Sequence, residues 1–293
     1  MGKGTADKAT VAERIRLTMA RLTRAEHALA HALLASYPVA GLASITEFAR
    51  AAKVSTPTVL RLAKKLGFSG FPPMQAALRN EVAAQLRDPI ARHHRWSQAA
   101  PDGHMLNRFA AAAMDNLRAS LKLIDHREFD RIADLIADPS HAVHIVGGRI
   151  TYPLAEYLHT HLHMIRPRSF LVPASSASWP QYLLNMDEAD VLVAFDIRRY
   201  EPRLSELAAQ AHLRGLRIVL FTDQWMSPAS SVATHAFPLR IEAPSSWDSN
   251  MVTLFMIEAL IADIVDRRWP ETERRIRELE ELSGAAARPR RNS

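Results

Sequence analysis

Hydrophobic residues in the first ninety positions recur every three to four residues, the spacing that lines one face of an α-helix. This pattern predicts helices over 9–36, 44–52, 55–66 and 73–87. The N-terminal part of the chain is therefore expected to be all-helical.

Capping signals delimit the two short helices in the middle of this region. Ser44, with Glu47 three residues later, forms a capping box that opens the first of them. Val54 lies in the turn, Ser55 is a favoured N-cap for the second helix, and Gly67 ends it. The buried side of the second helix is expected to consist of Val59, Leu60, Leu62, Ala63 and Leu66.

The pattern changes from position 141 onward, where short, almost wholly apolar runs alternate with helical stretches. The runs are 141–147, 169–173, 191–196, 217–223 and 235–242. Buried strands that alternate with helices are typical of a parallel sheet covered on both faces. The expected fold class is therefore α + α/β: an all-helical domain joined to a doubly wound, five-stranded parallel-sheet domain.

These patterns divide the chain into four parts. We expect a helical domain over 1–87, a linker without periodicity over 88–103, and the α/β domain over 104–270. Residues 271–293 form a charged tail that is expected to be helical at first and partly disordered at its end.

Positive charge is concentrated in the helical part. Residues 1–95 contain 15 Lys and Arg against 6 Asp and Glu, a net charge of +9, whereas the remainder contains 22 and 25, a net charge of −3. Lys and Arg that neutralise phosphates supply most non-specific affinity for DNA. The asymmetry favours a DNA-binding N-terminal half, although a solvated basic face would show it too.

Two short helices joined by a tight turn over 44–66 have the organisation of a helix-turn-helix, in which the second helix enters the major groove. Arg61 is the best candidate for a bidentate contact to guanine, and Lys64 and Lys65 suit phosphates. The alternative is an ordinary helical hairpin. The candidate DNA-contacting residues are Ser44 and six positions of the second helix that are expected to be exposed: Ser55, Thr56, Thr58, Arg61, Lys64 and Lys65.

The string VSTPTVLRLAKKLGFSGF, from Val54 to Phe71, resembles the N-terminal domain of the RpiR/MurR family of bacterial transcriptional regulators. The family pattern there is V-S-x-x-T-V-x-R-x-x-x-K-L-G-F-x-G-F, and the resemblance covers roughly 12–268. It implies that the second half is a sugar isomerase (SIS) domain, a flavodoxin-like fold that binds phosphosugars. A cytoplasmic location is expected because the chain contains no cysteine. Because such readers match operator symmetry with their own, we expect a homodimer or homotetramer on an inverted-repeat operator in double-stranded DNA.

The same resemblance implies two loops that hold a phosphosugar, and the chain departs from the family pattern in both. The first loop, G-x-G-x-S in the family, reads Gly147-Gly148-Arg149-Ile150-Thr151 here. The second, S-x-S-G-x-T in the family, reads Asp196-Ile197-Arg198-Arg199-Tyr200-Glu201. Arginine obstructs backbone contact with phosphate at a glycine position, yet its planar fork suits carboxylates and phosphates.

We therefore expect a small anionic effector, with a carboxylate-type metabolite plausible in place of a phosphosugar. The candidate effector-binding residues are Gly147, Gly148, Arg149, Thr151, Ser175, Asp196, Arg198, Arg199 and Ser249. The alternatives are internal salt bridges between Asp196 and the arginines, a SIS domain that only oligomerises, and a sugar-phosphate isomerase whose general base would be Glu201, the only acid of its loop besides Asp196.

Other signals point to no further chemistry. His159 and His163 lie one helical turn apart, but no third ligand accompanies them, so no metal site is expected. No catalytic constellation and no cofactor motif is visible. The chain has no cysteine, no secretory signal and no apolar run long enough to span a membrane, so no membrane contact is expected.

Overall fold

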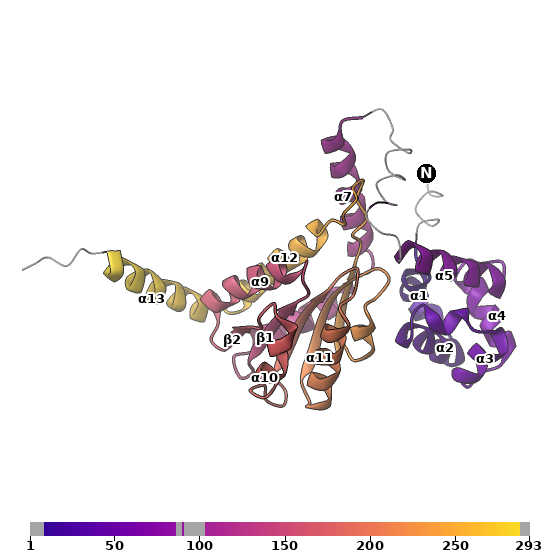
Figure 1. Ribbon diagram of the computed structural model, residues 1–293, viewed down its shortest axis with the longest axis horizontal. Helices are drawn as coiled ribbons and strands as arrows, with labels where there is room; N and C mark the ends of the chain where they lie inside the picture. Colours follow the sequence, from indigo (N-terminus) through magenta and orange to yellow (C-terminus); the bar gives the residue numbers. More distant parts are fainter. Residues whose placement is uncertain (1–8, 86–89, 91–102, 288–293) are drawn as a thin grey trace, which may run out of the picture.

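A computed structural model of the protein describes residues 9–85, 90 and 103–287 (Figure 1). The linker predicted over 88–103 lies almost wholly outside these residues. The helices before it are α1 (Val11–Thr18), α2 (Arg24–Ala35), α3 (Ile45–Ala51), α4 (Thr56–Lys65) and α5 (Phe71–Gln85), with 3₁₀ turns η2 (Met19–Arg21) and η3 (Val39–Leu42).

The continuous helix predicted over 9–36 is interrupted, and that expectation was wrong. Thr23 accepts a hydrogen bond from the backbone N–H of Glu26, while the Glu26 carboxylate accepts one from the backbone N–H of Thr23. This capping box starts a new helix, α2, at Arg24, so the chain turns after α1. A third capping box, Thr10 with Glu13, opens α1.

The helical part has its own hydrophobic core, separate from that of the α/β part. Helices α1 to α5 all contribute to it, and Phe48 and Phe71 lie stacked with their ring centroids 6.2 Å apart. Its fully buried members include Ile15, Leu29, Leu33, Val59, Leu62, Met74 and Leu78.

The α/β part is built on a five-stranded, all-parallel sheet. Its strands are β1 (Val143–Gly147), β2 (Ser169–Leu171), β3 (Val191–Asp196), β4 (Arg217–Asp223) and β5 (His235–Leu239). The strand order is β2-β1-β3-β4-β5, which is the flavodoxin-like doubly wound order. The predicted fold class is confirmed.

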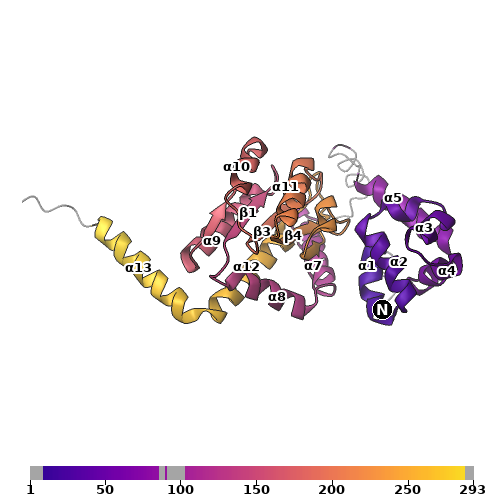
Figure 2. The ribbon, with the colours of Figure 1, turned by 90° about the horizontal axis from the view of Figure 1, so that it is seen from below.

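Helices cover both faces of this sheet (Figure 2). One core contains Val193 of β3 with α8 (His126–Ala137), α9 (Tyr152–Ile165) and α12 (Met251–Arg267). The other contains Leu192, on the opposite side of β3, with α10 (Trp179–Leu183) and α11 (Pro202–Leu213). Successive residues of a strand point to opposite faces, so wholly apolar strands are required here.

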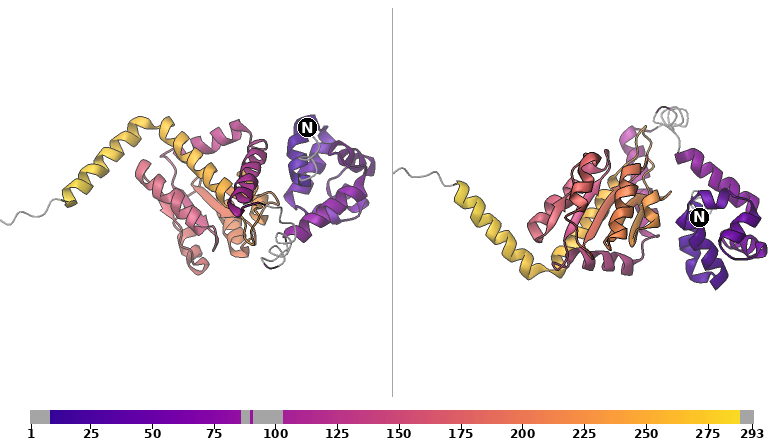
Figure 3. Two further views of the ribbon diagram at one scale, coloured as in Figure 1. Left: turned by 90° about the horizontal axis from the view of Figure 1, so that it is seen from above. Right: turned by 60° about the horizontal axis from the view of Figure 1, so that its bottom comes forward.

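Two further helices flank the α/β part. Helix α7 (Met105–Leu121) packs against α12, and α13 (Trp269–Ala287) begins against α9 and then projects away from both domains (Figure 3). The tail from residue 271 was expected to begin as a helix, and α13 agrees with this expectation. Residues 288–293 lie outside the described residues.

Candidate DNA-binding surface and effector crevice

Helices α3 and α4 form a compact pair joined by a short turn. Phe48 and Ala49 of α3 and Leu62 of α4 are buried in the helical core. In the turn, Lys53 has a φ of 53°, and the N–H of Val54 donates to the carbonyl of Ala49. The chain reverses within four residues, so α4 presents a continuous outer face.

That outer face carries most of the predicted DNA-contacting side chains. Ser55, Arg61 and Lys64 are exposed and Thr56 is half-buried. Leu60, predicted to be buried, is 41% exposed, because the buried side of α4 is narrower than expected. Ser44 is exposed at the start of α3, and its hydroxyl takes part in the predicted capping box with Glu47.

Two of the candidate side chains are engaged within the protein. Thr58 was expected to be exposed but is buried; its hydroxyl lies 3.0 Å from that of Ser55 and accepts a hydrogen bond of 2.9 Å from Arg61 Nη2. The Lys65 ammonium forms a 2.6 Å ion pair with the buried carboxylate of Glu26. Thr58 therefore orients Arg61 on the outer face, and Lys65 fastens α4 to α2.

The first effector loop, residues 147–151, is called the β1 loop here, and its backbone is packed tightly. A Cβ at Gly147 would lie 2.7 Å from the carbonyl oxygen of Thr151, so only glycine fits there. The Thr151 hydroxyl is buried and donates a 2.6 Å hydrogen bond to the carbonyl of Phe195. This hydroxyl joins the ends of β1 and β3.

The second loop, residues 196–201, is called the β3 loop, and its acidic groups lie where the family pattern has serine and threonine. Asp196 is buried; it accepts hydrogen bonds from the Ser227 hydroxyl and, at 3.2 Å, from the backbone N–H of Glu201. The Glu201 carboxylate lies close to Gly148, with Oε2 3.3 Å from where a Cβ would stand. Burial raises the pKa of Asp196 to about 6.

The three arginines of these loops have different surroundings. Arg149 and Arg199 are exposed, and within the described residues neither side chain forms a hydrogen bond or an ion pair. Arg198 is 9% exposed, lies 3.5 Å from Asp248 and stacks over the ring of Trp225 at 4.5 Å. The predicted salt bridge between Asp196 and an arginine is not among the contacts of the described chain.

Backbone conformation in the β3 loop keeps a trace of the family pattern. Arg199 stands where the pattern has glycine and has a φ of 55°, and Arg198 before it has a φ of 40°. Left-handed backbone conformations favour glycine. The loop therefore keeps a backbone conformation that suits the family glycine, although Arg199 occupies that position.

The two predicted serines lie in different environments. Ser175 is exposed after β2, whereas Ser249 is buried and its hydroxyl accepts a 3.3 Å hydrogen bond from the backbone N–H of Met251 at the start of α12. Neither side chain is hydrogen-bonded to the β1 or β3 loop in the described part of the chain.

Sequence reasoning missed a buried acid beside the predicted ones. Asp223 is fully buried at the end of β4; it accepts hydrogen bonds from the backbone N–H groups of Arg198 (2.7 Å) and Trp225 (2.9 Å) and from the Tyr200 hydroxyl (2.7 Å). Burial raises the pKa of this carboxyl to about 6. A polar residue that ends an apolar strand at the ligand-binding edge is the signal that marks it.

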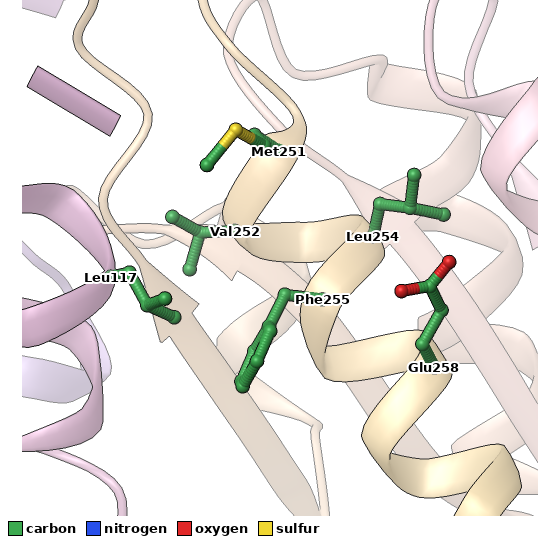
Figure 4. Close-up of a pocket in the computed structure, with 6 residues that line it drawn as sticks. All are labelled: Leu117, Met251, Val252, Leu254, Phe255 and Glu258. Carbon is green, nitrogen blue, oxygen red and sulfur yellow. The ribbon is translucent and has the colours of Figure 1, made fainter. Parts of the chain in front are cut away.

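A separate apolar pocket of about 200 Å³ lies between α7 and α12 (Figure 4). It is lined by Leu117, Met251, Val252, Leu254, Phe255 and Glu258. Its one charged side chain, Glu258, accepts a 3.1 Å hydrogen bond from the Tyr157 hydroxyl. An apolar lining with a carboxylate does not suit an anionic ligand.

Among the described residues, no group of three or more metal-ligating side chains converges on one point. His159 and His163 do lie together on α9, with ring centroids 5.4 Å apart. In the same part of the chain, none of the helices combines the length and the apolar character needed to span a bilayer.

The fold and these surfaces define a class of protein: a helix-turn-helix DNA-binding domain joined to a doubly wound α/β domain. Residues 9–85 match the helix-turn-helix domain of the rpiR family, and residues 136–262 match the SIS domain. The chain belongs to the RpiR family of helix-turn-helix transcriptional regulators with a SIS domain.

Relatives that span nearly the whole chain are transcriptional regulators by name. HexR of Pseudomonas aeruginosa is 26% identical, over 92% of this chain and 94% of HexR. YbbH of Bacillus subtilis, an HTH-type transcriptional regulator, is 24% identical, over 86% of this chain and 89% of YbbH.

Two solved structures share the fold. The sugar isomerase domain of an RpiR transcription factor from Sphaerobacter thermophilus has a TM-score of 0.57 and 18% identity, and covers 61% of this chain and 99% of that one. Vibrio vulnificus NanR in complex with ManNAc-6P has a TM-score of 0.53 and 19% identity, and covers 96% of this chain and 100% of that one.

Proposed function

We propose that α4 binds the major groove of an operator and that a small anion regulates this binding from the crevice between the carboxyl ends of β1 and β3. In doubly wound sheets ligands bind where the strand order reverses, which here is between these two strands. The protein would act in the cytoplasm, where the DNA is, as a homodimer or homotetramer on an inverted repeat.

The observation that carries the effector proposal is the pair Arg149 and Arg199. They follow adjacent strands, β1 and β3, so their loops border the proposed crevice on its two sides. Both are exposed and without an internal partner in the described chain, so both remain available for an anion. The two separate hydrophobic cores support the proposed division into domains at 1–87 and 104–270.

The chemistry of the crevice favours a carboxylate-type anion over a phosphosugar. NanR is bound to a sugar phosphate. In this chain, Glu201 adds a carboxylate beside Gly148, and the Thr151 hydroxyl is already bonded to Phe195. A phosphate group held by the backbone of the β1 loop would lie close to the Glu201 carboxylate and be repelled, whereas carboxylates held by the two outer arginines would lie farther from it.

Regulation without catalysis is the function we propose, because the buried acids are used internally. Both carboxylate oxygens of Asp196 accept hydrogen bonds from the chain, and so do both of Asp223. An isomerase needs a general base that faces its substrate, and Glu201 is the one acid of the β3 loop left for that role.

Titration calorimetry tests the effector class directly. Citrate, inorganic phosphate and glucose 6-phosphate are titrated into wild-type protein and into the double variant R149A/R199A, with Arg203→Ala on the surface of α11 as control. We expect citrate binding that the double variant loses and the control keeps. Tight binding of glucose 6-phosphate with no binding of citrate would overturn the carboxylate assignment.

A further inference from the structure

The helical domain is fastened to the edge of the sheet that carries the crevice. Three contacts join it to the segments that follow β3, β4 and β5, and all three segments lie at the carboxyl ends of their strands. The DNA-binding domain therefore shares this edge with the proposed effector site.

The contact with the β3 loop is made by Arg198. Its Nη2 donates a 3.0 Å hydrogen bond to the carbonyl of Ala84, in the last turn of α5. Carbonyls in the last turn of a helix lack partners within the helix, and a cation there is favoured by the helix dipole. Arg198 thus caps the last helix of the DNA-binding domain from inside the effector loop.

The other two contacts come from α1. Glu13 forms a bidentate ion pair with Arg240 after β5, with distances of 2.7 Å (Nε to Oε1) and 2.5 Å (Nη2 to Oε2). The Glu13 side chain is 1% exposed, so this pair is shielded from water. Arg16 Nη2 donates to the sulfur of Met226, in the loop after β4, at 2.9 Å.

Arg198 is held at this position by the protein and still has capacity to bond. Asp248 and the ring of Trp225 hold the guanidinium, and its backbone N–H is held by Asp223. Its Nη1 is buried and has no hydrogen-bond partner in the described structure. A buried donor that is left unpaired is unfavourable, so this side chain gains from any rearrangement that gives it an acceptor.

We propose that Arg198 is a latch, by which the β3 loop holds α5 when the crevice is empty and releases it when an anion binds. The proposal rests on the proposed function for the location of the effector. Arg199, which binds the anion, is the next residue in the chain, and both have left-handed backbone conformations. Moving Arg199 toward a ligand therefore moves Arg198, and the hydrogen bond to Ala84 breaks.

Release of α5 changes how the DNA-binding domain sits on the α/β domain. The Glu13–Arg240 pair lies on a different strand, β5, and serves as the second attachment, about which the helical domain turns. A regulator on an inverted repeat needs its two reading helices at a fixed spacing, so this turn alters DNA affinity. By linkage, DNA and effector affinities change by the same factor.

The absence of cysteine from the chain permits a distance measurement. Val39 and Leu213, 68% and 77% exposed in the helical and α/β domains, are replaced by Cys and spin-labelled, and the labelled protein is diluted with unlabelled full-length chain. Pulsed electron paramagnetic resonance then gives the interdomain distance distribution. The variants are R198A, R198K and R240Q, with R203A as the matched surface control.

We expect one docked distance in the wild type and in R203A. In R198A the ratio of docked to undocked protein falls by roughly tenfold or more, the value expected for one charged hydrogen bond, and R198K lies between the two. R240Q also broadens the distribution. Circular dichroism and a cooperative thermal unfolding transition establish that each variant is folded.

A folded R198A with the wild-type distance distribution would overturn the latch, and so would a wild-type distance unchanged by citrate that calorimetry shows to be bound. Failure of citrate and phosphate to bind would contradict the proposed effector class instead, while the R198A comparison still decides the latch. If citrate shifts the interdomain distance distribution in the same way as R198A does, the result supports both the proposed effector class and the latch.

Discussion

The polar side chains on the outer face of α4 and those at the carboxyl ends of the strands differ in how far they are exposed and in how far they are bonded within the protein. On α4, Arg61 and Lys64 face solvent; Thr58 orients Arg61, and the ion pair of Lys65 with Glu26 fastens the helix to α2. At the carboxyl ends of β3 and β4, the buried Asp196 and Asp223 and the side chain of Arg198 are bonded to the chain itself, and only Arg149 and Arg199 of the two effector loops reach solvent as free cations in the described chain. The family pattern is kept from Val54 to Phe71, which includes α4, and is lost in the β1 and β3 loops, where we propose a different effector.

The largest expected effect concerns the crevice backbone. Gly147→Ala places a Cβ 2.7 Å from the Thr151 carbonyl oxygen, and the atoms that this Cβ meets all belong to packed backbone, so the β1 loop must shift. Overpacking of this kind costs about 1–3 kcal/mol. Thermal unfolding should show a lower Tm for Gly147→Ala, while the nearby exposed-site control Arg149→Ala stays within about 0.5 kcal/mol of wild type. Equal stability of the two variants would mean that the loop is looser than described.

The buried acids Asp196 and Asp223 make the stability of the protein depend on pH. The pKa values of Asp196 and Asp223 are about 6 in the folded protein, raised by burial above the ordinary value near 3.9. The folded state therefore binds protons more strongly between about pH 4 and 6, and its stability falls as pH rises through that window. Together the two pKa shifts lower the free energy of unfolding by a few kcal/mol between about pH 4 and pH 7.

Asp196→Asn and Asp223→Asn keep a carbonyl acceptor and remove this titration. Urea unfolding at pH 4.5 and pH 7 should show a smaller loss of stability in each variant than in the wild type. Glu81 in the helical domain, whose pKa burial raises to about 7, supplies a background of the same sign in all three proteins. Parallel pH profiles for wild type and variants would show that the acids are ionised throughout.

The reading face is tested by Arg61→Ala. Loss of a bidentate base contact costs about 1–3 kcal/mol, so affinity for the operator should fall roughly 10- to 100-fold, with a smaller loss on unrelated DNA. Lys64→Ala should weaken binding to the operator and to unrelated DNA equally, and should reduce the salt dependence of both affinities. An equal loss of affinity by Arg61→Ala on every sequence would make Arg61 a phosphate contact.

The smallest effect is predicted for the strained backbone of the β3 loop. Arg199→Gly relieves a φ of 55° that costs an arginine about 1 kcal/mol, and the greater chain entropy of glycine offsets part of the gain. We expect unchanged or slightly raised stability together with weaker citrate binding. A marked loss of stability would show that the Arg199 side chain holds the fold.

Sequence patterns predicted most elements whose cause was local, although the capping box of Thr23 and Glu26, which is also local, interrupts the helix predicted over 9–36. The capping box of Ser44 and Glu47 lies within one helical turn, and the apolar strands are read directly from consecutive residues. Contacts between distant segments could not be predicted, because they depend on how the elements pack. Arg198 and Ala84 are 114 residues apart in the sequence, and Lys65 and Glu26 are 39 residues apart. Burial of Thr58 likewise depends on how α4 packs, not on its own turn.

The central claim, that α4 reads DNA under control of the crevice, is tested most directly by fluorescence anisotropy with a duplex from upstream of the protein's own gene. The wild type should bind it, Arg61→Ala should bind at least about tenfold more weakly, and citrate should shift the wild-type Kd. Wild-type affinity in folded Arg61→Ala, with no response to citrate, phosphate or glucose 6-phosphate, would contradict the claim.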